Sequence, residues 1–339
     1  YQGGHHEFFK YLVDLLREQN ADYIKIFGGG GGVILPSEAR ALEKYGVTKV
    51  YSPEDGRRLG LQGIISHMLE TADFALNSGS LDGDPSRLTT ESTALLARLI
   101  TEAEGPGLSD RSRESISRLA AKRDTRIIGI TGTGGAGKSS IADELLLRLL
   151  GDFPELQIAY LSVDPSKRKT GGAMLGDRIR MNSVFDQDRE PSKSPRVYVR
   201  SLATRGSLSE LSKVTEQAIQ ILQASGFDLI FVETAGIGQG SSAVVDISDV
   251  SLYVMTPEYG AASQLEKIDM LDYADLTAVN KYDRHGGEDA LREVRRQIRR
   301  NGQTFHDVPD PELPVFGTIA SQYGDAGVTA LYLALLRRL

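Results

Sequence analysis

The sequence contains no cysteine and no tryptophan, and its 339 residues include only five histidines. The lack of cysteine excludes disulfide bonds and thiolate metal sites. So few histidines, of which His5 and His6 are adjacent, argue against a dedicated transition-metal site. The chain also lacks an apolar run of about 18 residues, which a membrane-spanning helix would need, and it does not open on a secretory leader. We therefore expect a cytoplasmic protein with no membrane partner.

Clusters of basic residues are also scarce. The chain carries 46 acidic residues against 39 basic ones, a formal net charge of −7. Its lysines and arginines form no run of the kind that binds a phosphate backbone, so we expect no nucleic acid among its main partners. Hydrophobic residues make up 40% and charged residues 25%, which is typical of a globular chain. The length allows about two or three domains.

A glycine-rich loop with the pattern G-x-x-x-x-G-K-[ST] runs from Gly132 to Ser139. It follows an apolar stretch typical of a strand, 126–131, and precedes a stretch with helical periodicity. In this context the pattern is typical of a loop that binds phosphate groups. The backbone N–H groups turn toward a polyphosphate, and the helix N-terminus adds the positive end of its dipole. Lys138 would contact the β- and γ-phosphates, and the Ser139 hydroxyl would ligate Mg²⁺.

The tetrapeptide Asn280-Lys281-Tyr282-Asp283 follows another short apolar stretch, 276–279. Ligands of open α/β sheets lie at the carboxyl ends of strands, which is where this motif falls. The carboxylate of Asp283 can accept hydrogen bonds from the N1–H and the exocyclic amine of guanine. Adenine presents a lone pair at N1 and would leave the buried carboxylate unpaired. The motif therefore predicts GTP or GDP, rather than ATP, as the ligand.

Two acidic residues end predicted strands. Asp164 is positioned to reach Mg²⁺ directly or through water, which suits an ion that takes one or two carboxylates together with phosphates and waters. Glu233 stands where most GTPases have the aspartate of Asp-x-x-Gly. Its longer side chain could still hold a metal-bound water. The alternative is a strand-end acid that faces solvent.

Further candidates lie in two glycine-rich segments. In 169–180, Asp177 is another candidate Mg²⁺ ligand and Arg180 could stabilise negative charge, although both could equally be solvated surface charges. In 236–240, Gln239 could orient an attacking water.

Strand-like and helix-like segments alternate from Thr125 onward. Predicted strands lie near 126–131, 157–163, 228–234, 250–255, 276–280 and 314–318. Predicted helices lie near 138–150, 208–225, 260–273, 286–300 and 326–338. This alternation predicts a doubly wound α/β domain with a mostly parallel sheet over 125–339. The polar segment 183–195, with two prolines, predicts a flexible surface loop.

The first 124 residues are organised differently. Residues 1–72 predict the order helix–strand–helix–strand–helix, with strands at 22–27 and 47–51. Two strands alone do not make a stable open parallel sheet, and the chain lacks an initiator Met. We therefore expect a flavodoxin-like fragment that was cut inside a domain. Helical patterns at 88–103 and 109–123, after a turn-rich boundary, predict a helical linker over 73–124.

Several longer motifs belong together. They are Ser162-Val-Asp-Pro-Ser166, Thr170-Gly-Gly-Ala-Met-Leu-Gly-Asp-Arg-Ile-Arg180, Arg196-Val-Tyr-Val-Arg-Ser-Leu-Ala-Thr-Arg205 and Glu233-Thr-Ala-Gly-Ile-Gly-Gln239. This set resembles the G-protein chaperones of methylmalonyl-CoA mutase and its relatives. Upstream stand Tyr1-Gln-Gly-Gly-His5, Phe27-Gly-Gly-Gly-Gly-Gly-Val-Ile34 and Tyr51-Ser-Pro-Glu-Asp-Gly56. They resemble the second half of a cobalamin-binding domain, and the whole order resembles the family of fused isobutyryl-CoA mutases.

The resemblance implies a P-loop GTPase fold with roles for individual residues. The implied Mg²⁺ ligands are Ser139, the carbonyl of Val163, Asp164, Asp177, Glu233 and Thr234. The implied nucleotide contacts are Gly135, Ala136, Gly137, Lys138, Ser139, Ser140, Arg180 and Asn280 to Asp283. The expected catalytic residues are Lys138, Arg180, Glu233 and Gln239. For adenosylcobalamin, Gly28, Gly29 and Gly30 would let the dimethylbenzimidazole tail approach the backbone, which only glycine permits.

The implied function is GTP hydrolysis that gates cofactor loading and protection of an adenosylcobalamin-dependent acyl-CoA mutase. The full-length enzyme would interconvert isobutyryl-CoA and n-butyryl-CoA, with the mutase substrate domain as a partner in cis and a homodimer as the assembly. The Asp-x-His-x-x-Gly motif, whose histidine ligates cobalt, and the substrate barrel are absent from this sequence. We therefore expect GTP hydrolysis but no carbon-skeleton rearrangement from this chain.

Other interpretations stay open. A metallochaperone GTPase of the nickel-delivery kind shares the general architecture, and it predicts clusters of His or Cys ligands. A nucleotide-sensing scaffold that does not hydrolyse GTP is favoured by the helical linker and by Glu233 in place of aspartate. For residues 1–72, the alternative is a flavodoxin-like fragment whose glycines only turn the chain.

Overall fold

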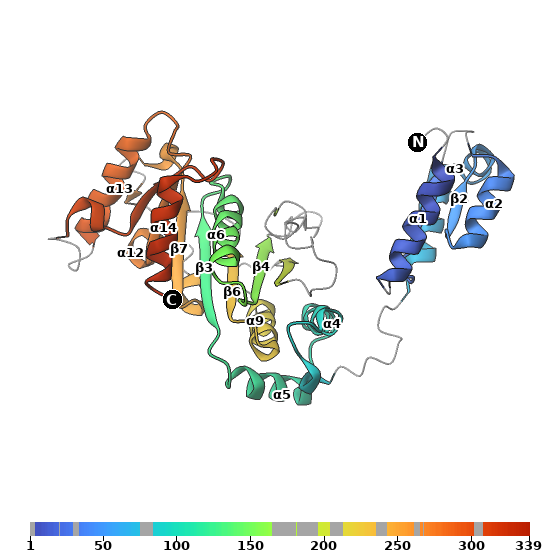
Figure 1. Ribbon diagram of the computed structural model, residues 1–339, viewed down its shortest axis with the longest axis horizontal. Coiled ribbons are helices and arrows are strands. Elements are labelled where there is room, and N and C mark those ends of the chain that lie inside the picture. The colour runs from blue at the N-terminus through green and yellow to red at the C-terminus, as the bar shows by residue number, and fades with distance from the viewer. Residues whose placement is uncertain are drawn as a thin grey trace. The chain divides into compact units, whose positions relative to one another are not determined.

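The computed structural model describes most of the chain as two compact units, residues 1–80 and 81–339 (Figure 1). The described residues are 4–19, 21–29, 34–74, 84–164, 181, 196–203, 213–234, 243–260, 265–266, 268–301 and 308–339. Within these ranges no helix is long and apolar enough to cross a membrane. The predicted division into 1–72, 73–124 and 125–339 stays a prediction.

Unit 2 is built on a seven-stranded sheet with the order β5-β4-β6-β3-β7-β8-β9, in which every neighbouring pair is parallel. The strands are β3 (Arg126–Gly132), β4 (Ile158–Asp164), β5 (Val197–Ala203), β6 (Leu229–Thr234), β7 (Val250–Met255), β8 (Leu276–Asn280) and β9 (Val315–Thr318). Because the sheet is buried on both faces, its central strands are almost continuously apolar. Their carboxyl ends all meet at one edge, where loops can build a site.

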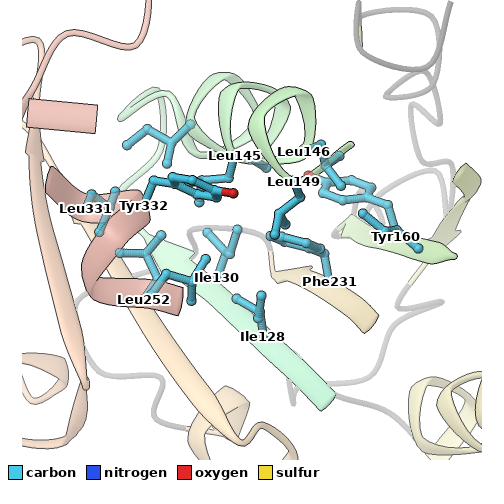
Figure 2. Packing of buried hydrophobic residues seen from close by; sticks show 14 of the residues in the cluster. Ile128, Ile130, Leu145, Leu146, Leu149, Tyr160, Phe231, Leu252, Leu331 and Tyr332 are labelled. Atoms are coloured by element: carbon cyan, nitrogen blue, oxygen red, sulfur yellow. The ribbon is translucent and has the colours of Figure 1, made fainter. Parts of the chain in front are cut away.

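Helices cover both faces of this sheet. They are α4 (Thr93–Glu104), α5 (Asp110–Ala120), α6 (Lys138–Asp152), α9 (Lys213–Ser225), α10 (Ala243–Ile247), α12 (Met270–Tyr273), α13 (Gly287–Asn301) and α14 (Ala326–Leu336). Short 3₁₀ turns are η1 (Pro85–Arg87), η2 (Pro257–Tyr259) and η4 (Asp310–Glu312). On one face α6 and α14 pack over apolar residues of the strands, including Ile128, Ile130 and Phe231 (Figure 2). On the other face α4, α5 and α9 cover one half, and α10, α12 and α13 cover the other.

The helices of the predicted linker are part of this core. Leu96, Leu99 and Ile100 of α4 are fully buried, and they share a cluster with Ile230 and Val232 of β6. Both α4 and α5 pack on α9. Arg200 of β5 also reaches α4, where its Nη2 lies 2.6 Å from Glu104 Oε2. The segment 88–120 therefore completes one layer of the α/β unit.

Each of the six predicted strands is present, and the described residues contain one further strand of unit 2, β5, that was not predicted. β5 pairs with β4 at the sheet edge, and its alternation of buried and partly exposed residues is that of an edge strand. The predicted helix 260–273 was wrong in extent. Of its described residues, only 265 and the short α12 are helical, and the chain turns at 266 and 269. The turn η2 lies just ahead of this segment. At Gly260, which follows η2, a Cβ would lie 2.4 Å from the Cβ of Ala290, so glycine lets this segment pack closely against α13. Residues 261–264 and 267, the first part of the predicted helix 208–225 and the predicted loop 183–195 lie outside the described residues.

Unit 1 has the predicted order of elements. They are α1 (His5–Glu18), β1 (Phe27–Gly29), α2 (Pro36–Tyr45), β2 (Lys49–Tyr51) and α3 (Pro53–Ala72), with β1 and β2 parallel. The predicted strand 22–27 was placed too early: residues 21–24 form a turn, in which Ile24 N donates to Ala21 O over 3.0 Å. None of the side chains of α3 is buried within this unit.

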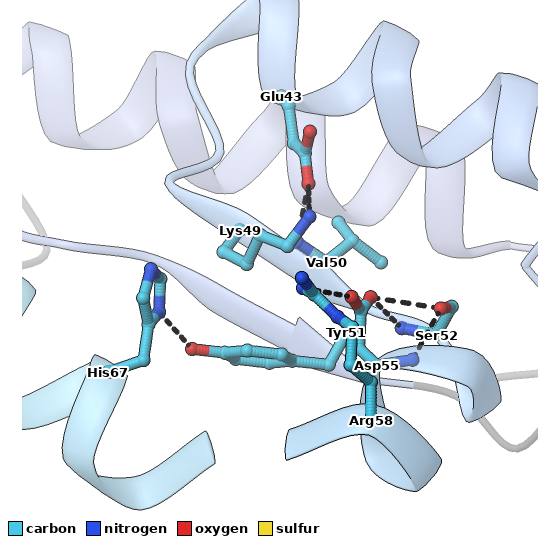
Figure 3. Close-up of polar contacts among 8 residues, drawn as sticks. All are labelled: Glu43, Lys49, Val50, Tyr51, Ser52, Asp55, Arg58 and His67. Atoms are coloured by element: carbon cyan, nitrogen blue, oxygen red, sulfur yellow. Dashed lines mark hydrogen bonds and ion pairs between the residues drawn. The ribbon is translucent and has the colours of Figure 1, made fainter. Parts of the chain in front are cut away.

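Local polar contacts hold α3 to β2 (Figure 3). Ser52 caps the helix, because its Oγ accepts from Asp55 N over 3.1 Å and Ser52 N donates to Asp55 Oδ2 over 2.9 Å. The hydrogen bond from the Ser52 backbone, with one from its side chain, lowers the pKa of Asp55. Farther along the helix, His67 Nδ1 lies 2.6 Å from the Tyr51 hydroxyl.

Candidate functional site

The phosphate-loop pattern forms the connection from β3 to α6. Gly137 precedes the helix with a φ of 89°, in the left-handed region that glycine adopts most readily. At Gly132 a Cβ would lie 1.9 Å from the backbone oxygen of Val254, so only glycine fits beside β7. The Nζ of Lys138 donates to the carbonyls of Gly132 and Thr133 over 3.3 and 3.4 Å. This buried lysine is therefore folded back along its own loop.

The tetrapeptide 280–283 lies against this loop. Asn280 is 3% exposed, and its Nδ2 donates to the backbone oxygen of Ala136 over 2.8 Å. Its Oδ1 accepts from Thr318 Oγ1 and Ala320 N over 3.2 and 3.1 Å. One side chain thus joins the phosphate loop to the ends of β8 and β9.

The neighbours of Asn280 extend the contact. Lys281 Nζ donates to the backbone oxygen of Gly135 over 2.7 Å. The ring of Tyr282 packs on Gly317, where a Cβ would come within 2.6 Å of the ring. Asp283 follows as an exposed residue. The phosphate-loop motif and the predicted base-reading motif therefore form one continuous surface at the carboxyl edge of the sheet.

Most of the predicted Mg²⁺ ligands gather at the same edge. The parallel register pairs Ser162 with Glu233 and Val163 with Thr234, so β4 and β6 end side by side, with Asp164 next to them. Ser139, at the start of α6, donates its hydroxyl to Glu233 Oε1 over 3.0 Å. Thr234 Oγ1 donates to Thr131 Oγ1 of β3 over 2.9 Å.

These groups fit a hard cation. Ser139, Asp164 and Glu233 offer hydroxyl and carboxylate oxygens, which are the ligand types that Mg²⁺ prefers, with phosphate oxygens and waters as the usual remaining ligands. Asp177, Arg180 and Gln239 lie outside the described residues, and their predicted roles stay predictions.

Comparison with known proteins identifies the family. Residues 96–331 match the family described as "Methylmalonyl Co-A mutase-associated GTPase MeaB". The chain belongs to this family of GTPases. It is also 52% identical, over 99% of its length, to a protein of Geobacillus kaustophilus named "Fused isobutyryl-CoA mutase", and 49% identical, over 99%, to one of the same name from Cupriavidus metallidurans. It spans only 31% and 30% of the length of these relatives.

One solved structure supports the fold. The crystal structure of a LAO/AO transport system kinase superposes with a TM-score of 0.53 at 21% identity, and the match covers 78% of this chain and 76% of the other. At this identity the likeness concerns the α/β architecture alone.

The MeaB-type site contains one buried partner that the sequence did not reveal. The hydroxyl of Tyr160 in β4 donates a hydrogen bond to Glu233 Oε2. Tyr160 stands in an apolar strand pattern, which predicts only that it is buried. The register between β4 and β6, which places it near Glu233, is not encoded in either strand alone.

A second feature lies beside the predicted guanine reader. Arg284 follows Asp283 in the chain, and its Nη1 lies 3.0 Å from Glu258 Oε1 of η2. The hydrogen bond from the Thr256 side chain, followed by the backbone N–H of Glu258 and by Arg284, lowers the pKa of Glu258 to about 2. This pair connects η2 with the loop that carries Asp283.

The three glycines predicted to contact the cobalamin tail, Gly28, Gly29 and Gly30, differ from one another in their surroundings. A Cβ on Gly28 would lie 2.6 Å from the ring of Phe9, so the packing of α1 on β1 requires this glycine. This packing concerns the side of Gly28 that faces α1, and the predicted contact of Gly28 with cobalamin stays a prediction. Gly29 is exposed, and Gly30 lies outside the described residues; their contact with cobalamin stays a prediction.

Proposed function

We propose that unit 2 binds and hydrolyses GTP and acts as a G-protein chaperone that gates cofactor loading and protection of an adenosylcobalamin-dependent acyl-CoA mutase. The observation that carries the proposal is the hydrogen bond from Asn280 to Ala136, because it joins the phosphate loop to the tetrapeptide that would read guanine. Membership of the MeaB family of GTPases supports the same activity.

In this proposal the phosphates lie along the loop from Gly135 to Ser140. Its backbone N–H groups and the start of α6 would supply positive potential, and Lys138 would supply a full charge. Asp283 would accept the two donors of guanine. Fixed donors of this kind stabilise charge that develops on the transferred phosphoryl group without reorganisation.

A bound Mg²⁺ would supply Lewis-acid stabilisation of the β- and γ-phosphate oxygens. Its proposed protein ligands are Ser139, Asp164, Glu233, Thr234, the carbonyl of Val163, and Asp177. Glu233 or Gln239 would orient the attacking water, and Arg180 would stabilise the phosphate charge.

The partner in this proposal is the substrate domain of an acyl-CoA mutase in cis, within a homodimer. The mutase partner is supported by relatives whose name is "Fused isobutyryl-CoA mutase" and which match this chain over nearly all of its length. The parent enzyme would interconvert isobutyryl-CoA and n-butyryl-CoA. Residues 1–72 would be part of its cobalamin-binding domain, with Gly29 and Gly30 beside the cofactor tail.

GTP turnover, measured with Mg²⁺, tests the proposal. We expect the chain to hydrolyse GTP and Ser139→Ala to lose at least about tenfold in rate, since a ligand of the cation would be gone. Ser117→Ala, on the exposed side of α5, is the matched control and should keep the full rate. Binding of GTP without turnover would favour the nucleotide-sensing scaffold, and tight binding of nickel but not of cobalamin would favour the metallochaperone.

A further inference from the structure

Glu233 receives a hydrogen bond on each of its carboxylate oxygens, from residues on two different elements. Ser139 Oγ, from the start of α6, donates to Oε1 over 3.0 Å, and the hydroxyl of Tyr160, from within the core, donates to Oε2. Tyr160 is fully buried, and Glu233 is 8% exposed. The carboxylate therefore bridges the phosphate-loop helix and the interior of the sheet.

The strand register explains how Tyr160 reaches this position. Tyr160 pairs with Phe231, and Ser162 pairs with Glu233, so all four side chains lie on the face that α6 covers. The ring of Tyr160 packs beside Phe231 with ring centroids 6.4 Å apart (Figure 2). Its hydroxyl donates to the carboxylate of Glu233, which lies two residues after Phe231 in β6. An aspartate at position 233 would be one methylene shorter, and this contact would be lost.

The two donors give each carboxylate oxygen of Glu233 a hydrogen-bond partner. A carboxylate oxygen accepts hydrogen bonds, and each hydroxyl points its donor at one of the two oxygens. A buried carboxylate needs such partners, because burial without them is costly. Tyr160 occupies Oε2, so the orientation that remains presents Oε1 to Ser139.

We propose that Tyr160 is a positioning residue for the cation site: its hydroxyl anchors Oε2 of Glu233, so that Oε1 is directed toward Ser139 and the other proposed Mg²⁺ ligands. This inference rests on the proposed function. It also gives glutamate a purpose where most GTPases have aspartate, since only the longer side chain spans from Tyr160 to Ser139.

The test is a Mg²⁺ titration of the full chain with a fluorescent GDP analogue, read as retention of the nucleotide rather than as turnover. We expect Tyr160→Phe to raise the Mg²⁺ concentration for half-maximal retention by about tenfold, the size typical of a lost partner behind a metal ligand. The phenylalanine keeps the buried ring, and melting curves check that the variant is folded.

Tyr332→Phe is the matched control. Tyr332 belongs to the same apolar cluster, and its hydroxyl also donates to a carboxylate, Asp152 Oδ2, over 2.7 Å (Figure 2). Asp152 is the last residue of α6, whereas Ser139 lies in its first turn. We expect Tyr332→Phe to retain the wild-type Mg²⁺ dependence.

A second pair of variants separates positioning from a general loss of packing. Glu233→Asp keeps the charge but withdraws from Tyr160, so adding Tyr160→Phe to it should change the Mg²⁺ dependence no further. Wild-type dependence in folded Tyr160→Phe, or effects of the two changes that simply add, would overturn the inference while GTP binding stands. A wild-type chain that does not retain GDP would overturn the proposed function and this inference together.

Discussion

The side chain of Asn280 and the backbone oxygen of Ala136 are 144 residues apart in sequence and 2.8 Å apart in space. Their hydrogen bond makes the phosphate loop and the loop after β8 parts of one structure. Disturbing either loop should therefore alter the other.

Replacement of Asn280 by alanine tests this link. The change would leave the Ala136 carbonyl, the Ala320 N–H and the Thr318 hydroxyl without their described partner. We expect a loss of about 3 kcal/mol in the free energy of unfolding, because buried polar groups would be left unpaired. Urea denaturation measures it. Lys281→Ala, whose contact is exposed, should cost less than about 1 kcal/mol; equal losses would contradict the special position of Asn280.

Asp283→Asn should change the preferred base. The asparagine oxygen can still accept from N1–H, but its amide is a donor and matches the carbonyl that xanthine carries where guanine has an amine. We expect weaker binding of GDP by at least about tenfold and tighter binding of xanthosine diphosphate. Competition against a fluorescent nucleotide measures both. An unchanged preference for GDP would show that Asp283 does not contact the base.

Gly137→Ala should damage the loop although the added group is small. The residue has a φ of 89°, and the new Cβ would lie 2.5 Å from Asn280 Nδ2. We expect a loss of about 2 kcal/mol in stability, from the left-handed conformation and the displaced asparagine together. The control is Gly151→Ala, in the last turn of α6, the helix that follows Gly137. Gly151 has open space around it, so the change should be neutral or should raise the stability by up to about 1 kcal/mol.

Arg200→Met tests the attachment of α4. Glu104 retains only 7% of its side-chain exposure, and Arg200 is its ion-pair partner at 2.6 Å. Removal of the arginine should lower the free energy of unfolding by about 3 kcal/mol, because a buried carboxylate loses its counter-charge. Thermal or urea unfolding measures it. Arg118→Met, from an exposed pair at 3.8 Å within α5, should cost less than about 0.5 kcal/mol. Similar values for both would mean that α4 is held by apolar contacts alone.

Glu258→Gln should have a pH-dependent effect. The folded-state pKa of Glu258 is about 2, below the ordinary 4.5, so the charged carboxylate stabilises the fold above about pH 4.5 and this contribution fades as the pH falls toward 2. Near neutral pH, we expect the free energy of unfolding of the wild type to exceed that of the variant by roughly 0.2–1 kcal/mol, the range of a half-exposed ion pair. Urea titrations at several pH values measure the difference. A difference that grows as the pH falls would refute this assignment.

Local patterns predicted the parts of the site that depend on neighbouring residues. The glycine and lysine spacing of 132–139 and the motif at 280–283 each report a loop between a strand and its next element, and both loops are where the pattern placed them. The contact of Tyr160 with Glu233 depends on the register between β4 and β6, which are far apart in the sequence but adjacent in the sheet. The residue pattern of either strand alone does not contain that register.

The same limit applies to the fold. Helical periodicity at 88–103 and 109–123 predicted α4 and α5. The periodicity shows that each helix has an apolar face, but it does not identify the part of the protein on which that face packs. Here that part is the sheet and α9. β5 was missed because its edge position leaves polar residues such as Arg200 within the strand.

The folded unit that contains the phosphate loop thus begins well ahead of that loop in the sequence. A gene fusion joined directly to β3 would omit α4 and α5, which together with α9 cover half of one sheet face, and the leucines and isoleucines exposed by this loss would favour aggregation. An upstream domain in a functional fusion has to connect ahead of Leu88, whose side chain belongs to the same apolar cluster. The ion pair of Glu104 with Arg200 attaches α4 to β5, which pairs with β4, the strand that ends in Asp164.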